Sequence, residues 1–284
     1  MRVLVLGSSG FLGSNISFYL KKKFKNVFLH TNQFNTNYSY DLTNKNNINN
    51  LFNLTSPDVV INCIGLTNVD LCENNKNLCN ELNCRLVKNI AEVSDNNKCW
   101  FIHISTDHVY NINKLNLEDD VMLTNQYSKS KFNGDEFAVK FNALVLRTNF
   151  FGSLIKVSKK ASFMDWVIKN YQTKKKINLF NDVIFSPLLA DTVSQIITEL
   201  LNKNFGLQGL FNLGSNSVVS KEQLAKKILF KSLKVKQFQY NSIRANKFLK
   251  VIRPNFMQMN SSKFIKETNI YLPTIEDELK KINT

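Results

Sequence analysis

Long apolar runs are missing from this sequence. No stretch approaches the roughly 18 consecutive apolar residues that a membrane-spanning helix needs, so we expect no membrane partner. The first apolar run, Val3 to Leu6, is also too short for the hydrophobic region of a secretory signal peptide. We therefore expect a cytoplasmic protein. Its 284 residues are enough for one large domain or for two unequal ones.

Patterns for metal binding and for disulfides are also missing. None of the cysteines forms a C-x-x-C pair, and no nearby histidine completes a zinc pattern. Their number is odd, and they fall within one stretch of the chain: Cys63, Cys72, Cys79, Cys84 and Cys99. We expect free thiols in a reducing compartment and no metal site.

Acidic residues are too few to balance the basic ones, since 37 Lys and Arg against 22 Asp and Glu leave a net charge of +15. A strongly basic chain suggests nucleic acid as a partner. However, the lysines are scattered apart from runs at 21–23 and 174–176, and no recognised nucleic-acid-binding motif accompanies them. We therefore expect no nucleic-acid partner, and instead a positive field that attracts small anionic molecules.

Short apolar runs alternate with helical patterns through the first half of the chain. The β-rich runs lie at 2–7, 26–31, 58–65, 99–106 and 143–148, and the helical patterns at 11–24, 47–55, 74–94 and 126–141. Such alternation predicts a parallel sheet covered by helices on both faces. Near-continuous apolar runs such as Asp58 to Asn62 fit strands buried on two sides. The predicted fold class is α/β, a Rossmann-type doubly wound parallel sheet.

The alternation loosens after Arg147. Helical signals recur at 161–172, 190–203, 220–231 and 274–283, and strand-like pieces at 177–180 and 208–213. We expect the middle pieces to return to the sheet and the remainder to form a smaller C-terminal lid that binds substrate. The predicted domains are a dinucleotide-binding domain of residues 1–148 and 177–213, and a lid of residues 149–176 and 214–284.

Glycine is scarce, with 9 residues against the roughly twofold larger number that average usage of about 7% would give. Three of them, Gly7, Gly10 and Gly13, nevertheless stand together between a predicted strand and helix. In a dinucleotide-binding turn the first glycine permits the sharp turn, the second lets backbone approach a pyrophosphate, and the third lets helix pack on strand. The helix N-terminus then offers N–H groups to the phosphates. A tight turn without a ligand is the alternative.

Tyr127 and Lys131 lie four residues apart in a predicted helix and therefore project from one face. A phenol with its usual pKa near 10 is a poor acid–base catalyst at neutral pH, and a nearby ammonium would lower that pKa. The alternative is a helix with one half-buried Tyr and one solvated Lys.

Ser105, Thr106 and Asp107 lie at a predicted strand end, the edge where such sheets bind ligands, although they could instead cap a helix.

The spacing G-x-x-G-x-x-G resembles that of the extended short-chain dehydrogenases/reductases. Further segments of that superfamily follow in order: STDHVY at 105–110, YSKSK at 127–131 and RTNFFG at 147–152. The segments at 58–73, 180–192 and 252–264 are similar to those of the dTDP-4-dehydrorhamnose reductase (RmlD-like) family, collinearly from residue 1 to about 280. The resemblance implies NAD(P)H-dependent reduction of the 4-keto group of a nucleotide-linked 4-keto-6-deoxysugar, in the biosynthesis of surface polysaccharide sugars.

The resemblance also implies roles for single residues. Catalysis falls to Thr106, which would hydrogen-bond the reacting oxygen, to Tyr127, which would donate the proton, and to Lys131, which would bind the nicotinamide ribose and tune Tyr127. The implied cofactor contacts are Gly7, Gly10, Phe11, Leu12, Gly13, Asp41, Leu42, Cys63, Ile64, Gly65, Thr67, Tyr127 and Lys131. The implied substrate contacts are Thr106, Asp107, His108, Tyr127, Phe150 and Arg253. Asp41 could instead cap a surface helix, and Arg253 could anchor the C-terminal segment.

Some positions depart from that family. The predicted second strand ends in His30-Thr31-Asn32, without the acidic residue that selects NAD, so we expect NADPH, with NADH as the alternative. His108 stands where the family usually has Tyr, and Phe150 where it has Trp. The 182–188 segment also differs. Because these changes lie on the substrate side, they leave the identity of the sugar open.

Two other classes of function fit the same pattern. One is another nucleotide-sugar enzyme of the extended superfamily, an epimerase or a dehydratase, although the Glu that a dehydratase generally has is missing after Asp107. The other is a non-catalytic relative that binds NADP as a regulatory subunit. The sequence leaves the oligomeric state open, a homodimer included.

Overall fold

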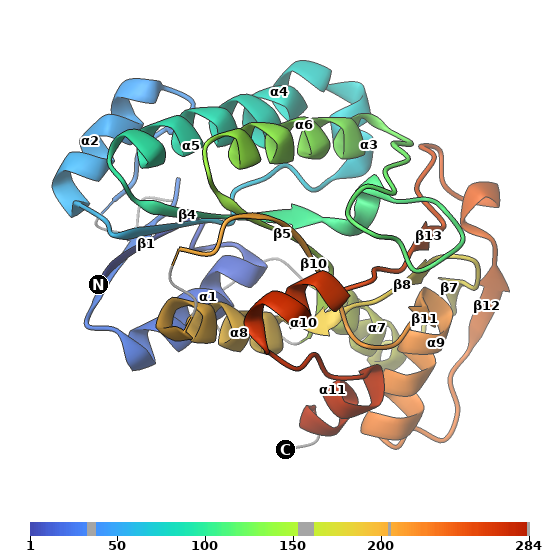
Figure 1. The fold of residues 1–284 in the computed structure, drawn as a ribbon. Helices are drawn as coiled ribbons and strands as arrows, with labels where there is room; N and C mark the ends of the chain where they lie inside the picture. The colour runs from blue at the N-terminus through green and yellow to red at the C-terminus, as the bar shows by residue number, and fades with distance from the viewer. Residues whose placement is uncertain (33–37, 153–161, 204–205, 283–284) are drawn as a thin grey trace.

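A six-stranded parallel sheet forms the centre of the computed structural model, which describes residues 1–32, 38–152, 162–203 and 206–282 (Figure 1). Its strands are β1 (Arg2–Leu6), β2 (Asn26–His30), β3 (Val59–Asn62), β4 (Trp100–Thr106), β5 (Leu144–Thr148) and β10 (Gly209–Leu213). Their order is β10-β5-β4-β3-β1-β2, and every neighbouring pair runs parallel. Numbered in chain order within this sheet, the strands lie as 2-1-3-4-5-6, a doubly wound order that reverses between β1 and β3, so the predicted α/β fold with a doubly wound parallel sheet is confirmed.

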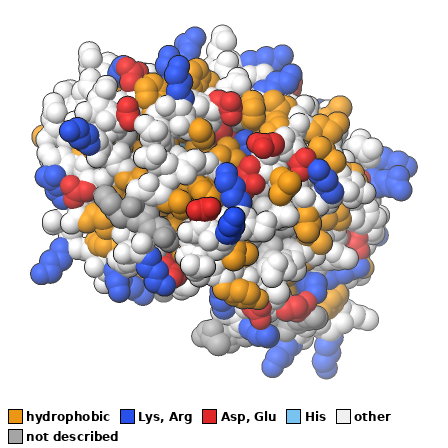
Figure 2. Space-filling model, viewed as in Figure 1, with side chains coloured by type: hydrophobic (Ala, Val, Ile, Leu, Met, Phe, Trp, Pro, Cys, Tyr) orange, Lys and Arg blue, Asp and Glu red, His pale blue; other side chains and the backbone are white. Residues whose placement is uncertain are grey.

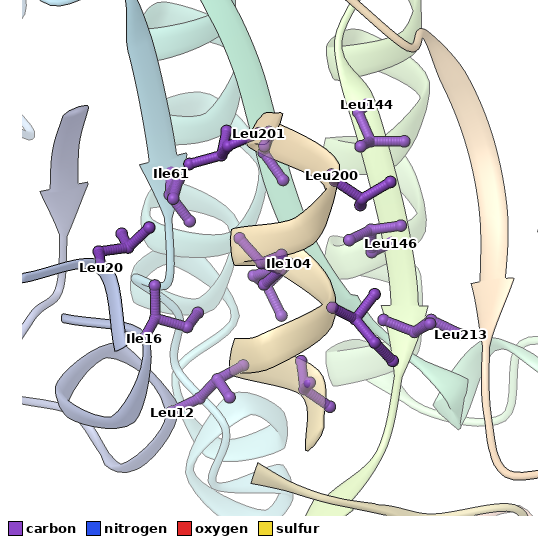
Figure 3. Close-up of a cluster of buried hydrophobic side chains, with 14 of the residues drawn as sticks. Leu12, Ile16, Leu20, Ile61, Ile104, Leu144, Leu146, Leu200, Leu201 and Leu213 are labelled. Carbon is purple, nitrogen blue, oxygen red and sulfur yellow. The ribbon is translucent and has the colours of Figure 1, made fainter. Parts of the chain in front are cut away.

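Helices cover both faces of the sheet, which explains why its inner strands are buried and largely apolar. On one face lie α1 (Phe11–Lys23), α8 (Ala190–Lys203) and α10 (Ser262–Thr268), and on the other α2 (Lys45–Thr55), α5 (Leu86–Asn96) and α6 (Gln126–Lys140) (Figure 1). All seven residues of β4 are buried as a result. Figure 3 shows the first face, where Leu200 and Leu201 of α8 and Ile16 of α1 point into the core beneath the strands.

The predicted helix at 74–94 forms in the structure, with a π-helical turn within it and a separate short helix before it. Residues 69–96 form α3 (Val69–Asn74), α4 (Lys76–Asn80), the π-helical turn η1 (Glu81–Arg85) and then α5. Asn75 starts α4 because its side chain accepts a hydrogen bond from the Leu78 N–H at 3.0 Å, as an N-cap does. The helical backbone then runs without a break from Lys76 to Asn96, so the predicted helix is confirmed with its bounds shifted by two residues.

A smaller layer lies beside the carboxyl end of the sheet, at the right of Figure 1. Its strands are β6 (Phe150–Phe151), β7 (Ile177–Phe180), β8 (Ile184–Phe185), β9 (Leu188–Leu189), β11 (Val219–Ser220), β12 (Tyr240–Ile243) and β13 (Phe256–Met257). Its helices are α7 (Phe163–Gln172), α9 (Lys221–Lys226) with the π-helical turn η3 (Lys227–Ser232), the 3₁₀ turn η4 (Ala245–Lys247) and α11 (Ile275–Lys281). Another 3₁₀ turn, η2 (Asp107–Val109), follows β4.

Two expectations about this layer are wrong. Residues 177–180 do not return to the main sheet, because β7 pairs with β12 instead. Its buried residues alternate, with Ile177 and Leu179 in a separate core cluster, whereas a central parallel strand is buried on both faces. Residues 262–272 were expected in the lid, yet Phe264 and Leu272 pack in the core of the main sheet. The strand at 208–213 does join the sheet, as β10.

The surface carries its charge in a scattered way. On the face in Figure 2, Lys and Arg side chains are spread over the molecule and interspersed with Asp and Glu. Of the helices in the described ranges, none combines the length and the apolar character needed to cross a bilayer. All five cysteines are free thiols.

Candidate active site

Two cavities lie end to end along the carboxyl edge of the sheet, and together they form one trough. Each has a volume of about 300 Å³. The predicted cofactor residues Gly10, Phe11, Leu12, Gly13, Thr67, Tyr127 and Lys131 border the first, and Gly7, Asp41 and Leu42 border the second. Gly10, Cys63, Ile64 and Gly65 border both. The structure thus brings all thirteen predicted cofactor residues to one trough.

The glycine turn forms the floor of the trough. Gly7 has φ +75°, a left-handed conformation that favours glycine. A Cβ on Gly13 would lie 2.2 Å from the Gly7 carbonyl oxygen, so α1 can pack on the turn only with hydrogen at that position. Gly10 is the N-cap of α1 and has no side chain to cap the first N–H groups. The turn therefore leaves a helix N-terminus facing a cavity, as an anion-binding site requires.

Tyr127 and Lys131 reach the first cavity from the first turns of α6. That helix begins with a capping box, in which Asn125 accepts from the Ser128 N–H at 2.9 Å and Ser128 Oγ lies 3.2 Å from the Asn125 N–H. Tyr127 lies edge-on to His108, with ring centroids 5.3 Å apart. Lys131 Nζ donates to the Ile104 carbonyl oxygen at 2.9 Å and lies 3.1 Å from His103 Nε2.

The electrostatics of this pair differ from the sequence-based expectation. Burial raises the pKa of Tyr127 above its usual value, the Thr106 side chain opposes that rise by hydrogen bonding, and Asp107 adds to it. The net lowering of the Tyr127 pKa that was expected from the Lys131 ammonium does not occur in this structure, because burial dominates. Burial lowers the pKa of Lys131 itself to about 8. At neutral pH Tyr127 is therefore protonated and able to donate a proton.

Thr106 ends β4 and borders the first cavity, whereas Asp107 does not. The Asp107 carboxylate is buried and accepts two hydrogen bonds from Asn149 Nδ2, at 3.0 and 2.8 Å. Burial raises the pKa of Asp107 to about 7. The chain turns this carboxylate toward Asn149, which does border the cavity, and the expected substrate contact by Asp107 stays a prediction.

A family profile described as RmlD substrate binding domain matches residues 1–284, the whole chain. The chain belongs to the RmlD family. A dTDP-4-dehydrorhamnose reductase of Clostridium acetobutylicum has a structure similar to it, with a TM-score of 0.87 and 23% identity over 99% of this chain and 98% of that one. The Sulfolobus tokodaii protein described as a hypothetical dTDP-4-dehydrorhamnose reductase has a TM-score of 0.83 and 26% identity, over 97% of this chain and 98% of that one.

Among curated proteins, this RmlD-family chain is 27% identical over 197 residues to the probable low-salt glycan biosynthesis reductase Agl14 of Haloferax volcanii. That match covers 67% of this chain and 65% of the Haloferax protein, slightly less than two thirds of its length. The dTDP-4-dehydrorhamnose reductase of Salmonella typhimurium is 23% identical over 218 residues, which cover 72% of this chain and 71% of that protein.

On the substrate side of the RmlD-family site, Phe150 and His108 border the first cavity and Arg253 does not. The Phe150 ring stacks on Phe11, which also borders the cavity, with centroids 5.8 Å apart. Burial lowers the pKa of His108 to about 3, so its imidazole is neutral at working pH. Arg253 forms an ion pair with Asp70 at 2.6 Å. The predicted contact of Arg253 with substrate stays a prediction.

The second cavity has no carboxylate at the end of β2. Thr31 is buried there, and its hydroxyl lies 2.7 Å from Ser9 Oγ. The Nε2 atom of His30 lies 2.8 Å from the Tyr40 carbonyl oxygen. Asp41 accepts hydrogen bonds from Thr43, and these bonds lower the pKa of its carboxyl group. Asp41 borders the second cavity and does not cap α2, because the N-cap of that helix is Asn44.

Several residues that border the trough were not assigned a ligand contact from the sequence, although Ser105 and residues 30–32 were noted as strand-end residues. They are Ser9, His30, Thr31, Asn32, Thr43, Leu82, Leu86, Ile104, Ser105, Thr148 and Asn149. Most follow a strand or stand in its last positions, so the rule that parallel strands end at one edge could have found them. Ser105 Oγ, Thr148 Oγ1 and His108 Nδ1 are buried without a hydrogen-bond partner among the described residues. Because such groups are costly unpaired, a polar ligand fits this cavity.

Proposed function

We propose that this chain is an NADPH-dependent reductase of the 4-keto group of a nucleotide-linked 4-keto-6-deoxysugar in glycan biosynthesis. The observation that carries the proposal is the shared trough, in which a glycine turn and the Thr106, Tyr127 and Lys131 side chains border one cavity. The names of the curated relatives and structural neighbours support the same reaction class. Membership of the RmlD family makes a reductase the first activity to test.

The trough fits a dinucleotide. Gly10 and the first turn of α1 would hold the pyrophosphate, and the cavity at Asp41 and Thr31 would hold the adenosine end. Because Thr31 stands where NAD-selective enzymes carry a carboxylate, the end of β2 itself does not repel a 2′-phosphate, which favours NADPH over NADH. When bound, the nicotinamide supplies the hydride that the reduction needs.

Tyr127 is the proton donor in this proposal. Its raised pKa keeps the phenol protonated at neutral pH, as an acid for a developing alkoxide must be. The Thr106 hydroxyl, which accepts from the His108 N–H at 3.2 Å, would orient the reacting oxygen beside Tyr127. Lys131, with its pKa near 8, would bind the nicotinamide ribose and restore the proton of Tyr127.

The smaller layer of β7, β8, β11–β13, α7, α9 and α11 would bind the sugar nucleotide. Phe150 and His108 face the cavity from that side, and His108 is neutral, so it can donate or accept a hydrogen bond with a sugar hydroxyl. Arg253 would contact a substrate phosphate if its ion pair with Asp70 opens. Asp107 would act only through Asn149.

The test is direct reduction. The protein is mixed with NADPH and dTDP-4-keto-6-deoxyglucose, with and without a 3,5-epimerase, and absorbance at 340 nm is followed. We expect NADPH to be consumed in stoichiometric amounts. An epimerase recycles its cofactor, so a converted sugar without net loss of absorbance would contradict the proposal, as would binding of NADPH without turnover of any nucleotide ketosugar.

A further inference from the structure

Asn149 lies beside the predicted catalytic residues. It follows Thr148, the last residue of β5, and Thr148 pairs in register with Thr106 at the end of β4. The backbone carbonyl of Asn149 accepts a hydrogen bond from the Leu188 N–H at 3.0 Å, which fixes the chain at this point. Asn149 also borders the first cavity. It is therefore held next to the hydroxyl that would orient the reacting oxygen.

The orientation of the Asn149 amide is fixed by Asp107. That carboxylate is fully buried, and both of its oxygens accept hydrogen bonds from Asn149 Nδ2, at 3.0 and 2.8 Å. A carboxylate only accepts, whereas the two ends of an amide differ, so the amide nitrogen must face Asp107. The opposite orientation would set two acceptors against each other. Asp107 therefore determines which end of the amide is left for a ligand.

The end left for a ligand is Oδ1 of Asn149. It accepts no hydrogen bond from the part of the chain that the structure describes, and it is not among the buried polar atoms without a partner, so it is open. Because Asn149 borders the cavity and Asp107 does not, the amide presents this oxygen on the cavity side. An amide oxygen accepts and cannot donate, whereas the hydroxyls of Ser105 and Thr148 can do either. The cavity therefore contains one acceptor of fixed polarity.

We propose that Asn149 is a ligand-binding residue whose Oδ1 accepts a hydrogen bond from a donor next to the reacting carbon, and that Asp107 is the positioning residue that holds the amide in this orientation. This inference rests on the proposed function, which brings two such donors to Thr106. They are the carboxamide N–H of the nicotinamide and the sugar hydroxyl at C3, beside the 4-keto group. Both offer the same chemistry, a neutral N–H or O–H donor.

The charges around Asp107 bear on this orientation. Burial raises the pKa of Asp107 to about 7, while the hydrogen bond from Asn149 and the charge of Lys221 in α9 act in the opposite direction. The other titratable neighbours are Tyr127 of α6, whose pKa is raised, and His108, whose pKa is about 3, so neither changes its charge between pH 6 and 8. A protonated Asp107 could donate to Asn149 Oδ1, and the amide would then turn its nitrogen toward the cavity.

The first test compares ligands that differ in one donor, by isothermal titration calorimetry. NADP⁺ is compared with its 3-acetylpyridine analogue, whose methyl ketone keeps the carbonyl group and has no N–H. In the presence of NADP⁺, dTDP-4-keto-6-deoxyglucose is compared with its 3-deoxy counterpart. In one of these pairs the ligand with the donor should bind the unmodified protein about threefold to tenfold more tightly, the range for one neutral hydrogen bond. The pair that shows this preference identifies the donor.

Asn149→Leu should abolish the preference, since leucine has a similar shape and no acceptor. Asp107→Asn should reduce it, because an amide at that position can face either end of the Asn149 amide. Asn212→Ala is the matched control: this buried asparagine of β10 borders neither cavity, so the variant should lose stability and keep the preference. A preference that is absent from both pairs in the unmodified protein, or unchanged in Asn149→Leu, overturns the inference.

The pH profile of the preference tests the positioning role of Asp107. As the pH rises from 6 to 8 Asp107 loses its proton, the Asn149 oxygen stays toward the cavity, and the preference for the ligand with the donor should grow. In Asp107→Asn it should stay constant. A preference that does not grow with pH in the unmodified protein, or that grows equally in Asp107→Asn, overturns the positioning role.

Neither test needs turnover. If the NADP⁺ pair shows the preference and the chain reduces no ketosugar, the proposed function fails and the role of Asn149 stands. If the chain is a reductase and neither pair shows a preference, only the role of Asn149 fails. Should Asn149→Leu not fold, the pH profiles of the unmodified protein and of Asp107→Asn still decide.

Discussion

Gly13→Ala tests whether α1 must pack directly on the glycine turn. The added methyl would lie 2.2 Å from the Gly7 carbonyl oxygen, and the obstacle is backbone rather than a flexible side chain. In an ordinary helix the change gains about 1 kcal/mol, whereas overpacking costs about 1–3 kcal/mol. At so short a distance we take the upper value, which leaves a net loss in the free energy of unfolding of about 2 kcal/mol. That corresponds to a fall in Tm of roughly 4–8 °C.

The same displacement moves the N–H groups that we propose face a pyrophosphate. NADPH affinity should therefore fall at least about tenfold, which is 1.4 kcal/mol of binding free energy. Urea unfolding measures the stability, and quenching of protein fluorescence by NADPH measures the dissociation constant. The increase in stability that a fixed concentration of NADPH gives should also be smaller in Gly13→Ala than in the unmodified protein.

Gly214→Ala is the matched control. Its methyl would also meet backbone, 2.9 Å from the Ser186 carbonyl oxygen, but Gly214 borders neither cavity. It should lose stability and keep its NADPH affinity. If Gly13→Ala instead proves as stable as the wild type and binds NADPH as tightly, the close packing of α1 on the turn is not what the three glycines serve.

Three further predictions concern the site. Tyr127→Phe should bind NADPH normally and lose at least about 100-fold in turnover, the contribution of a positioned general acid; unchanged turnover would remove Tyr127 from the mechanism. Lys131 has a pKa of about 8 in the folded chain against 10.5 ordinarily, so the unfolded state binds more protons between these values and the free energy of unfolding should rise with pH across that window. Lys131→Met should remove that rise, and urea midpoints from pH 8 to 10 that stay parallel in the two proteins would contradict it. Asp107 has a pKa of about 7 against 3.8 ordinarily, so the folded state holds a proton that the unfolded state loses, and this group lowers stability as pH rises from 4 to 7. Asp107→Asn should flatten that part of the stability curve, and an unaltered slope would show that Asp107 is ionised when folded.

The strands and the glycine turn could be predicted from sequence because their causes are local. β3 and β4 are rich in apolar and β-branched residues and are buried throughout, and Gly7, Gly10 and Gly13 stand at fixed spacing after β1. The pairing of β7 could not be predicted, since it depends on β12, some sixty residues later, rather than on its own composition. The same applies to α10, which packs under the sheet only because the chain returns there.

The site shows a similar division. The sequence motifs predict which residues border the trough. The hydrogen-bond and ion-pair partners of each side chain, which the motifs do not reveal, determine its role there. Asp107 follows Thr106 directly and still turns toward Asn149, and Arg253 is held by Asp70 from a distant helix. His103 lies inside an apolar strand, where sequence alone indicates nothing more than a core position.

Leu12 belongs to two environments at once, since it borders the first cavity and packs in the core between α1 and the sheet (Figure 3). A change made there to alter a ligand contact would also disturb the packing of the whole layer. Substitutions of Leu12 that would adapt the cavity to a different cofactor are therefore restricted by the packing of the core. Such adaptation is more readily achieved at Ser9 and Thr31, whose hydroxyls border the second cavity and lie outside the hydrophobic core clusters.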